Sequence, residues 1–229
     1  MVQRRGIALF DVDGPLRGGN IAHWPEYLAQ EGLFSIVALE KVRADVIALH
    51  SKRTTYKEFA KNILNHMAQG VKGQSAKKVK AATRKFVMQP NLMKLHPHAV
   101  ELVNRMNQRG ISVAVTAQPH EFAEALMQIL PFHMAFGTEL EVVGGKYSGQ
   151  VKRNLSIEKG TILKELKRHP QYWRGISYGF GDRVTDANML RETTKPIALN
   201  PDEKMRKYAK RKKWGIAKGS NILSRIRKR

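Results

Sequence analysis

Residues 7–16 read IALFDVDGPL, a short apolar run that stops at Asp11 and Asp13 and then turns through Gly14 and Pro15. An apolar run bounded by turn residues indicates a buried strand of a parallel sheet. Ligands bind at the carboxyl ends of strands in open α/β sheets, where these two acids would stand. An ordinary acidic turn explains the same residues, because Asp and Gly are favoured in turns for backbone reasons. Taken alone, the stretch leaves both interpretations open.

The composition is that of a folded protein with one domain and an insertion, or with two small domains. The chain has 229 residues, of which 42% are hydrophobic, and it contains no cysteine. The lack of cysteine excludes disulfides, thiol nucleophiles and thiolate metal sites, and it fits a reducing compartment. The apolar run before Asp11 is too short for a secretory signal or a membrane span, so we expect a soluble cytoplasmic protein.

The charge balance is strongly basic, with 41 Lys and Arg against 19 Asp and Glu and a net charge of +22. Such a field attracts polyanions and anionic substrates, and it also keeps a protein soluble. Residues 204–229 are rich in Lys and Arg and contain no acid. Their apolar residues are regularly spaced, which predicts a terminal helix and strand docked on the sheet. Only residues 225–229 are expected to be free to move.

Residues 18–94 form a region of helical pattern, because their apolar residues recur at helix-like spacing without a β-rich run. Thr54 or Thr55 is expected to cap one helix, and Ser75 is expected to cap the next. This region is predicted to be a helical insertion.

Strand and helix patterns alternate after Pro97. We expect strands over residues 111–115, 175–180 and 196–199, and a β-hairpin over 139–149. Such alternation predicts a doubly wound, mostly parallel α/β sheet with helices on both faces. The expected organisation is therefore an α/β core domain over residues 1–17 and 95–229, with a helical cap domain inserted over 18–94.

Polar side chains follow three of the expected strands, namely Asp11 and Asp13, then Thr116, then Asp182 and Asp186. Because the ends of parallel strands lie on one edge of a sheet, these side chains can converge. Four clustered carboxylates repel one another unless a cation lies among them, and an all-oxygen ligand set favours Mg²⁺. A hydroxyl followed by the start of a helix is suited to phosphate oxygens.

These residues, taken in order, resemble the motifs of the haloacid dehalogenase superfamily of phosphatases, and within it the branch around phosphoserine phosphatase with a small helical cap. The matching motifs are Asp11-Val12-Asp13-Gly14, Val115-Thr116, Lys159, and Gly181-Asp182 continuing to Asp186. The separation of Lys159 from Asp182 is similar to that of the branch. The resemblance covers nearly the whole chain, and four ordered motifs are far more specific than a single Asp-x-Asp.

The resemblance implies a role for each of these residues. Asp11 would be the nucleophile that forms an aspartyl-phosphate, and Asp13 would be the general acid and then the base. Mg²⁺ would be held by Asp11, the backbone carbonyl of Asp13 and Asp182, with Asp186 as a direct ligand or a support. The phosphoryl oxygens would be held by Thr116, Ala117 and Lys159.

The chain departs from the family pattern at three positions. Pro15 stands where the first motif usually ends in Thr, and Arg183 stands where the fourth motif usually has a small residue. Arg183 would either bind an anionic part of the substrate or face solvent. Asn20 occupies the stretch where phosphoserine phosphatases carry a Glu for the amine of the substrate, which argues against phosphoserine. His96 and His98 flank Pro97, a spacing that favours a turn over a ligand pair.

Three functions remain open from the sequence. The leading hypothesis is a Mg²⁺-dependent phosphatase that hydrolyses a small phosphorylated metabolite. The second is a catalytically weak or inactive module that uses its basic surface to bind nucleic acid or another anionic partner. The third is transfer of the phosphoryl group to an acceptor other than water. The complete set of motif residues favours an enzyme, because a decayed site has no need of them, and no pattern indicates an oligomeric state.

Overall fold

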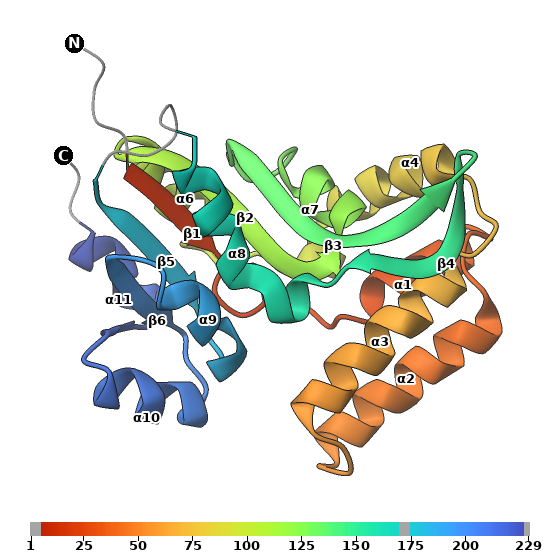
Figure 1. Ribbon diagram of the computed structural model, residues 1–229, viewed down its shortest axis with the longest axis horizontal. Helices are drawn as coiled ribbons and strands as arrows, with labels where there is room; N and C mark the ends of the chain where they lie inside the picture. The colour runs from red at the N-terminus through yellow and green to blue at the C-terminus, as the bar shows by residue number, and fades with distance from the viewer. Residues whose placement is uncertain (1–5, 170–174, 227–229) are drawn as a thin grey trace.

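The computed structural model of the chain describes residues 6–169 and 175–226 (Figure 1). Its centre is a seven-stranded sheet in the order β4-β3-β2-β1-β5-β6-β7, counted over these residues. Neighbouring strands are parallel, except that β3 and β4 form an antiparallel hairpin. The strands are β1 (Gly6–Phe10), β2 (Gly110–Pro119), β3 (Met134–Val143), β4 (Lys146–Arg153), β5 (Ser177–Gly181), β6 (Lys195–Leu199) and β7 (Gly215–Ala217). The predicted doubly wound, mostly parallel α/β fold is confirmed.

Several strands differ in extent from their predictions: the hairpin predicted over 139–149 spans 134–153, β6 begins one residue earlier than predicted, and β2 and β5 also differ. β2 continues past Val115 to Pro119, because its last residues pair with Thr138 of β3 after a shift in register. β5 begins at Ser177 and not at Gly175, and the segment before it holds glycine in a positive-φ conformation. The predictions located the middle of both strands correctly, and pairing with the neighbouring strands determines where each strand begins and ends.

Strand β1 shows how the sheet is covered on both faces. Ile7 and Leu9 pack in one apolar cluster, whereas Ala8 and Phe10 pack in the other, as the alternation of side chains along a strand requires. The first cluster includes residues of α8 (Leu155–Lys167), α9 (Ala187–Leu190) and α10 (Glu203–Arg211). The second includes residues of α6 (Ala99–Asn107), α7 (His120–Leu126) and α11 (Gly219–Arg225). Asp11 therefore follows a strand that is buried on both faces.

The insertion after β1 contains four main helices, which lie together at one end of the molecule (Figure 1). They are α1 (His23–Gln30), α2 (Ile36–His50), α3 (Tyr56–Gly70) and α4 (Ala76–Val87), followed by the short α5 (Pro90–Met93). Thr55 caps α3 in a capping box with Glu58, and the Ser75 hydroxyl accepts a hydrogen bond from the Lys78 N–H at the start of α4. Trp24 is buried in this helical region, and its indole N–H donates to the Thr83 hydroxyl at 3.0 Å.

The hairpin of β3 and β4 joins the sheet to these helices. It turns at Gly144 and Gly145, and its tip reaches the segment between α3 and α4 (Figure 1). Backbone hydrogen bonds run from the Gly73 N–H to the Tyr147 carbonyl at 2.8 Å and from the Ala76 N–H to the Gly145 carbonyl at 2.9 Å. The insertion is thus held by the sheet at a point far from its own two ends.

The basic C-terminal segment packs on the sheet, as its apolar residues predicted. Met205 and Ala209 of α10 and Ile222 of α11 are buried in the two apolar clusters. Arg225, expected to be mobile, lies in α11, and its guanidinium donates to the Ile216 carbonyl. Ile226, also expected to be mobile, is buried, and residues 227–229 of that end fall outside the described residues. Along residues 6–169 and 175–226, the helices lack the length and apolar character that crossing a membrane requires.

Candidate active site

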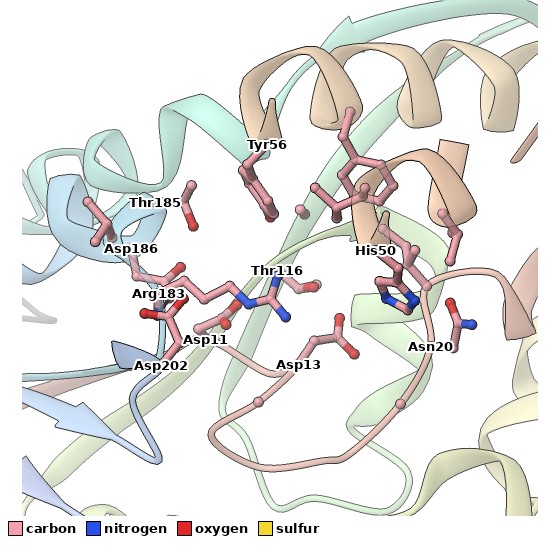
Figure 2. A pocket seen from close by; sticks show the side chains of 18 of the residues that line it. Asp11, Asp13, Asn20, His50, Tyr56, Thr116, Arg183, Thr185, Asp186 and Asp202 are labelled. Carbon is pink, nitrogen blue, oxygen red and sulfur yellow. Dashed lines mark hydrogen bonds between the residues drawn. The ribbon is translucent and has the colours of Figure 1, made fainter. Parts of the chain in front are cut away.

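One large pocket lies at the carboxyl edge of the sheet (Figure 2), and it is lined by the motif residues Asp11, Asp13, Thr116, Lys159 and Asp186. The pocket has a volume of about 1200 Å³, and it lies between the ends of the strands and helices α2 and α3 of the insertion. Asp11 enters it from the end of β1, where the Asp11 N–H donates to the Phe180 carbonyl of β5 at 2.8 Å. The predicted convergence of the strand ends is therefore present in the structure.

Lys159 is the cation at the centre of this edge. Its ammonium donates to Asp11 Oδ1 at 2.6 Å and to Asp186 Oδ1 at 2.7 Å, and all three residues are buried. Burial alone would lower the pKa of Lys159, but the charges of Asp11 and Asp186 hold that pKa well above its usual value. Lys159 is therefore a permanent positive charge beside Asp11.

Asp186 is occupied by hydrogen bonds on both of its oxygens. Oδ1 accepts from Lys159, and Oδ2 accepts from the N–H groups of Asp182 and Arg183 at 3.1 Å each. These contacts fix the turn after β5 that carries Asp182. Asp186 therefore acts on the site by holding Asp182 and Lys159 in position.

Asp182 faces the loop after β1 at very short range. The Asp182 Oδ1 atom is buried and has no hydrogen-bond partner among the described residues. A Cβ atom built on Gly14, whose φ is +107°, would lie 2.2 Å from Asp182 Oδ2. The loop can pass over Asp182 only because position 14 is glycine.

Three carboxylates at this edge form a group suited to a cation. Asp11, Asp182 and Asp186 each offer an oxygen within 4.8 Å of the others, and all three are buried. Burial and the neighbouring charge of Asp186 raise the pKa of Asp11 to about 7. Burial and the charges of Asp11 and Asp186 raise the pKa of Asp182 to about 9. With all three carboxyls ionised, their negative charge would exceed the positive charge of Lys159, and a divalent cation would compensate the difference in place of protons.

Asp13 stands apart from this carboxylate cluster. Its side chain is partly exposed and points into the pocket (Figure 2). Arg17 Nη1 lies 3.3 Å from Asp13 Oδ1, within ion-pair distance but without hydrogen-bond geometry. Arg17 is itself buried, and its Nε donates to the Met93 carbonyl at 3.1 Å. A fixed guanidinium therefore orients the carboxyl group of Asp13.

Thr116 and Ala117 form the wall of the pocket on the β2 side. Thr116 is fully buried, and its hydroxyl oxygen accepts from the Gln118 N–H at 3.1 Å. The Thr116 hydroxyl proton thus remains available to an oxygen in the pocket. The Ala117 carbonyl accepts from the Thr138 hydroxyl at 2.8 Å, which fixes the backbone of this strand end.

Two histidines that the sequence indicated only as part of a turn support the loop that follows β1. His96 Nε2 lies 3.0 Å from the Gly14 carbonyl, and His98 Nε2 lies 2.9 Å from the Pro15 carbonyl. Because a carbonyl only accepts, both rings must carry a proton on Nε2. The rings are stacked with centroids 5.4 Å apart. Buried loop carbonyls require donors from elsewhere in the chain, but no sequence pattern identified these two histidines as the donors.

Two of the three departures from the family pattern, Arg183 and Asn20, line the pocket. Arg183 extends its guanidinium into the pocket toward Thr116 (Figure 2), so it is not directed only to solvent. Asn20 lines the opposite side, where its side-chain oxygen accepts from the Ala22 N–H at 3.0 Å. Asn20 therefore stabilises the turn before α1 as well as bordering the pocket.

Comparisons with known proteins agree with this geometry. A model of the haloacid dehalogenase-like hydrolase family matches residues 8–191. The histidinol-phosphatase of Neisseria meningitidis serogroup C is 25% identical over 228 residues, which cover 93% of this chain and 98% of that protein. The phosphoserine phosphatase SerB1 of Mycobacterium tuberculosis is 24% identical over 231 residues, which cover 91% of this chain and 69% of that protein.

A solved structure is also similar over almost its full length. The crystal structure of a protein with unknown function from Bordetella pertussis Tohama I has a TM-score of 0.74 and 22% sequence identity. The likeness covers 94% of this chain and 99% of that chain. It shows that the whole architecture, sheet and helical insertion together, is shared.

Proposed function

The chain belongs to the haloacid dehalogenase-like hydrolase family and is a phosphatase of that family, and we propose that it hydrolyses a small phosphomonoester with Mg²⁺ through an aspartyl-phosphate at Asp11. The observation that carries this proposal is the position of Lys159, whose ammonium bonds to both Asp11 and Asp186 at the pocket floor. A buried carboxylate kept beside a fixed ammonium, with one oxygen toward the pocket, is arranged for nucleophilic attack.

In the first step, Asp11 attacks the phosphorus of the substrate. Lys159 holds Oδ1 of Asp11 at 2.6 Å, which leaves Oδ2 to form the new bond to phosphorus. The bond between phosphorus and the alcohol oxygen breaks, and the leaving oxygen takes up a proton. The lone ammonium also offsets the repulsion between Asp11 and the incoming phosphate, both of which are anionic.

Asp13 is the group that moves the proton. Its partly exposed carboxyl group lies at the pocket, two residues beyond the nucleophile, and Arg17 orients it. Asp13 gives its proton to the leaving alcohol and then takes one from the water that attacks the aspartyl-phosphate. Such acid–base assistance typically contributes about 10²–10⁴-fold to a rate.

Thr116, Ala117 and Lys159 are proposed to hold the phosphoryl oxygens. The hydroxyl proton of Thr116 is free of protein acceptors in the described residues, since the Thr116 oxygen is engaged only as an acceptor from Gln118. Donors fixed in this way before the substrate arrives stabilise the charge that develops on the phosphoryl group.

The residues present fit a Mg²⁺ ion. Asp11 and Asp182 would hold it with the backbone carbonyl of Asp13, and the unpartnered Oδ1 of Asp182 is the feature that favours this assignment. Both oxygens of Asp186 already accept hydrogen bonds, which favours a role in positioning Lys159 and Asp182 over direct binding of Mg²⁺. A bound Mg²⁺ supplies positive charge that draws the phosphate and the nucleophile together. Helices of the insertion, residues 18–94, are proposed to be the cap that covers this site.

The proposal is tested by hydrolysis of 4-nitrophenyl phosphate with Mg²⁺, comparing the wild-type protein with Asp11→Asn. We expect the substitution to remove measurable turnover, because an amide is not a nucleophile toward phosphorus. Asp45→Asn is the matched control, since Asp45 pairs with His66 on the helical insertion and does not line the pocket. Turnover that is unchanged in Asp11→Asn would rule out Asp11 as the nucleophile.

The covalent intermediate has its own test. Rapid acid quenching followed by borohydride reduction converts an aspartyl-phosphate to homoserine, which mass spectrometry locates in the peptide that contains Asp11. A label on Asp13 in place of Asp11 would overturn the assignment of roles. A panel that includes phosphoserine, histidinol phosphate and nucleoside monophosphates would then identify the substrate, and addition of an acceptor alcohol would distinguish transfer from hydrolysis.

A further inference from the structure

Arg183 is a charged group at the pocket mouth that the proposed chemistry does not use. Its guanidinium lies 5.8 Å from the centroid of the Tyr56 ring of α3, and its Nε lies 3.6 Å from Asp182 Oδ2. The side chain is 50% exposed, and no described residue accepts a hydrogen bond from its guanidinium. Arg183 therefore reaches from the sheet to the helical insertion, and its Nη groups remain available to a ligand while Nε faces Asp182.

More positive charge borders the same pocket. Lys52 and Lys94 line it and are exposed, and neither forms an ion pair with any residue in the described ranges. His50 projects into the pocket from the end of α2 (Figure 2). His23 also lines the pocket, and its Nδ1 atom is buried without a hydrogen-bond partner in the described structure. Groups able to donate to an anion thus occur around the opening.

The acids that line the pocket are already engaged. Asp11, Asp13 and Asp186 belong to the reacting centre. Asp202 accepts from the Met205 N–H at the start of α10, and Glu203 pairs with Arg206 at 2.9 Å. Among the described lining residues, the insertion contributes His, Lys and uncharged side chains but no carboxylate. An ammonium group on a substrate would therefore find no free counter-charge on this side.

We propose that the substrate carries a second anionic group besides the scissile phosphate, and that Arg183, stacked beside Tyr56, binds this group and determines specificity. The inference rests on the proposed phosphatase chemistry at Asp11. Val46, Leu49 and Phe59 line the pocket and offer apolar surface to the organic part between the two anionic ends. The substrate class is thus an anionic phosphomonoester with an apolar or aromatic body, such as a phosphorylated carboxylic acid.

The test uses three phosphate esters that differ only in a remote charge. They are benzyl phosphate, 4-carboxybenzyl phosphate and 4-(aminomethyl)benzyl phosphate, whose scissile bonds are nearly equal in reactivity. We expect kcat/KM for the carboxylate to exceed that for the neutral ester by about tenfold, the value of one charge-assisted hydrogen bond of about 1.4 kcal/mol. The cationic ester is expected to be the poorest of the three substrates.

Variants of Arg183 test whether this residue causes the preference for the carboxylate ester over the neutral ester. Arg183→Gln is expected to bring the ratio of carboxylate to neutral ester close to one, and Arg183→Lys is expected to restore only part of it, since Lys lacks the planar fork. Arg84→Gln is the matched control, because it removes the same charge from α4 outside the pocket and should leave the ratio unchanged.

The outcomes separate this inference from the proposed function. If none of the three esters is hydrolysed, or if turnover persists in Asp11→Asn, the phosphatase chemistry itself is wrong. If benzyl phosphate is hydrolysed and the carboxylate gives no advantage, the second anionic group is excluded. If Arg183→Gln lowers kcat/KM equally for all three esters, Arg183 acts on the scissile phosphate and the inference is overturned.

Discussion

Lys159 Nζ lies 2.6 Å from Asp11 Oδ1 although the two residues are 148 positions apart, and both side chains are buried. The contact connects the second turn of α8 to the residue that follows β1. Because Lys159 also binds Asp186, one ammonium links three separate segments of the sheet edge. The stability of this edge and its reactivity therefore depend on the same cation.

Replacement of Lys159 should affect both properties. In Lys159→Ala, Asp11 and Asp186 keep their burial but lose their counter-charge, and breaking a buried ion pair costs about 3–5 kcal/mol of the free energy of unfolding. Urea denaturation measures this loss, and turnover should fall by at least about a hundredfold. Lys164→Ala on the exposed face of α8 is the control and should change stability by less than about 0.5 kcal/mol.

The carboxylate cluster predicts an unusual pH dependence for the metal-free protein. The pKa of Asp182 is raised from its ordinary 3.8 to about 9, so the folded protein holds a proton that the unfolded chain releases. The free energy of unfolding should therefore fall as the pH rises from about 4 toward about 9. Urea midpoints in the presence of a chelator measure this slope, which should be shallower in Asp182→Asn.

Mg²⁺ should stabilise the protein more as the pH rises, which is opposite to the trend expected for the metal-free protein. The cation binds the ionised carboxylates, so protons compete with it and its stabilising effect grows as the pH rises. We expect a larger increase in Tm on adding Mg²⁺ at about pH 9 than at about pH 6. An increase of equal size at both values, or one that persists in Asp182→Asn, would mean that Mg²⁺ binds elsewhere.

His98 is expected to position the catalytic loop. Its Nε2–H bonds to the Pro15 carbonyl, and a loop displaced by its loss would misalign Asp11 and Asp13. His98→Ala should lower kcat by about ten- to a hundredfold with a smaller change in KM. His98→Gln keeps a donor near the Nε2 position and should recover part of kcat, which a merely space-filling role would not predict. His66→Ala, which affects an ion pair of the helical insertion, is the control.

Gly14→Ala tests the close approach of the loop to Asp182. The new methyl group would lie 2.2 Å from Asp182 Oδ2 in a backbone conformation that L side chains rarely adopt. We expect the loss of the Mg²⁺-dependent increase in Tm together with loss of turnover. Gly144→Ala is a matched control, because Gly144 also has positive φ but meets no atom within 4 Å. Its strain of about 1–3 kcal/mol should lower stability without affecting Mg²⁺.

Much of the fold was predictable because its signals are local. The apolar run before Asp11, the alternation after Pro97 and the glycine pair at the hairpin each indicated an element that the structure contains. The ends of elements were less predictable, since β2 extends to Pro119 through pairing with β3, a contact distant in sequence. The connection of the hairpin tip to the insertion had no signal either, because backbone hydrogen bonds are independent of side-chain type.

In the candidate site too, the residues with sequence motifs were predictable and the residues that support them were not. The order of the motifs predicted that Asp11, Thr116, Lys159 and Asp182 meet at one edge of the sheet. In the structure, Asp11, Thr116 and Lys159 line one pocket, and Asp182 lies beside Asp11 in the carboxylate group. Their roles remain proposals. The supporting residues were not predictable, because His98 acts on a backbone carbonyl and leaves no motif in the sequence. The net charge of +22 did not reveal a partner, since a sum over the chain does not say which charges share a cavity.

The bond between the hairpin tip and the helical insertion determines how this enzyme can open. Because Gly73 and Ala76 are held by the carbonyls of Tyr147 and Gly145, the insertion cannot rotate about its two covalent connections alone. Any opening must carry the tip of the β3–β4 ribbon with it, and the ribbon has irregular register around Leu140 where it can bend. The insertion therefore has a third, non-covalent connection to the sheet, and a cap movement over the pocket would have to bend the two-stranded ribbon or break these two hydrogen bonds.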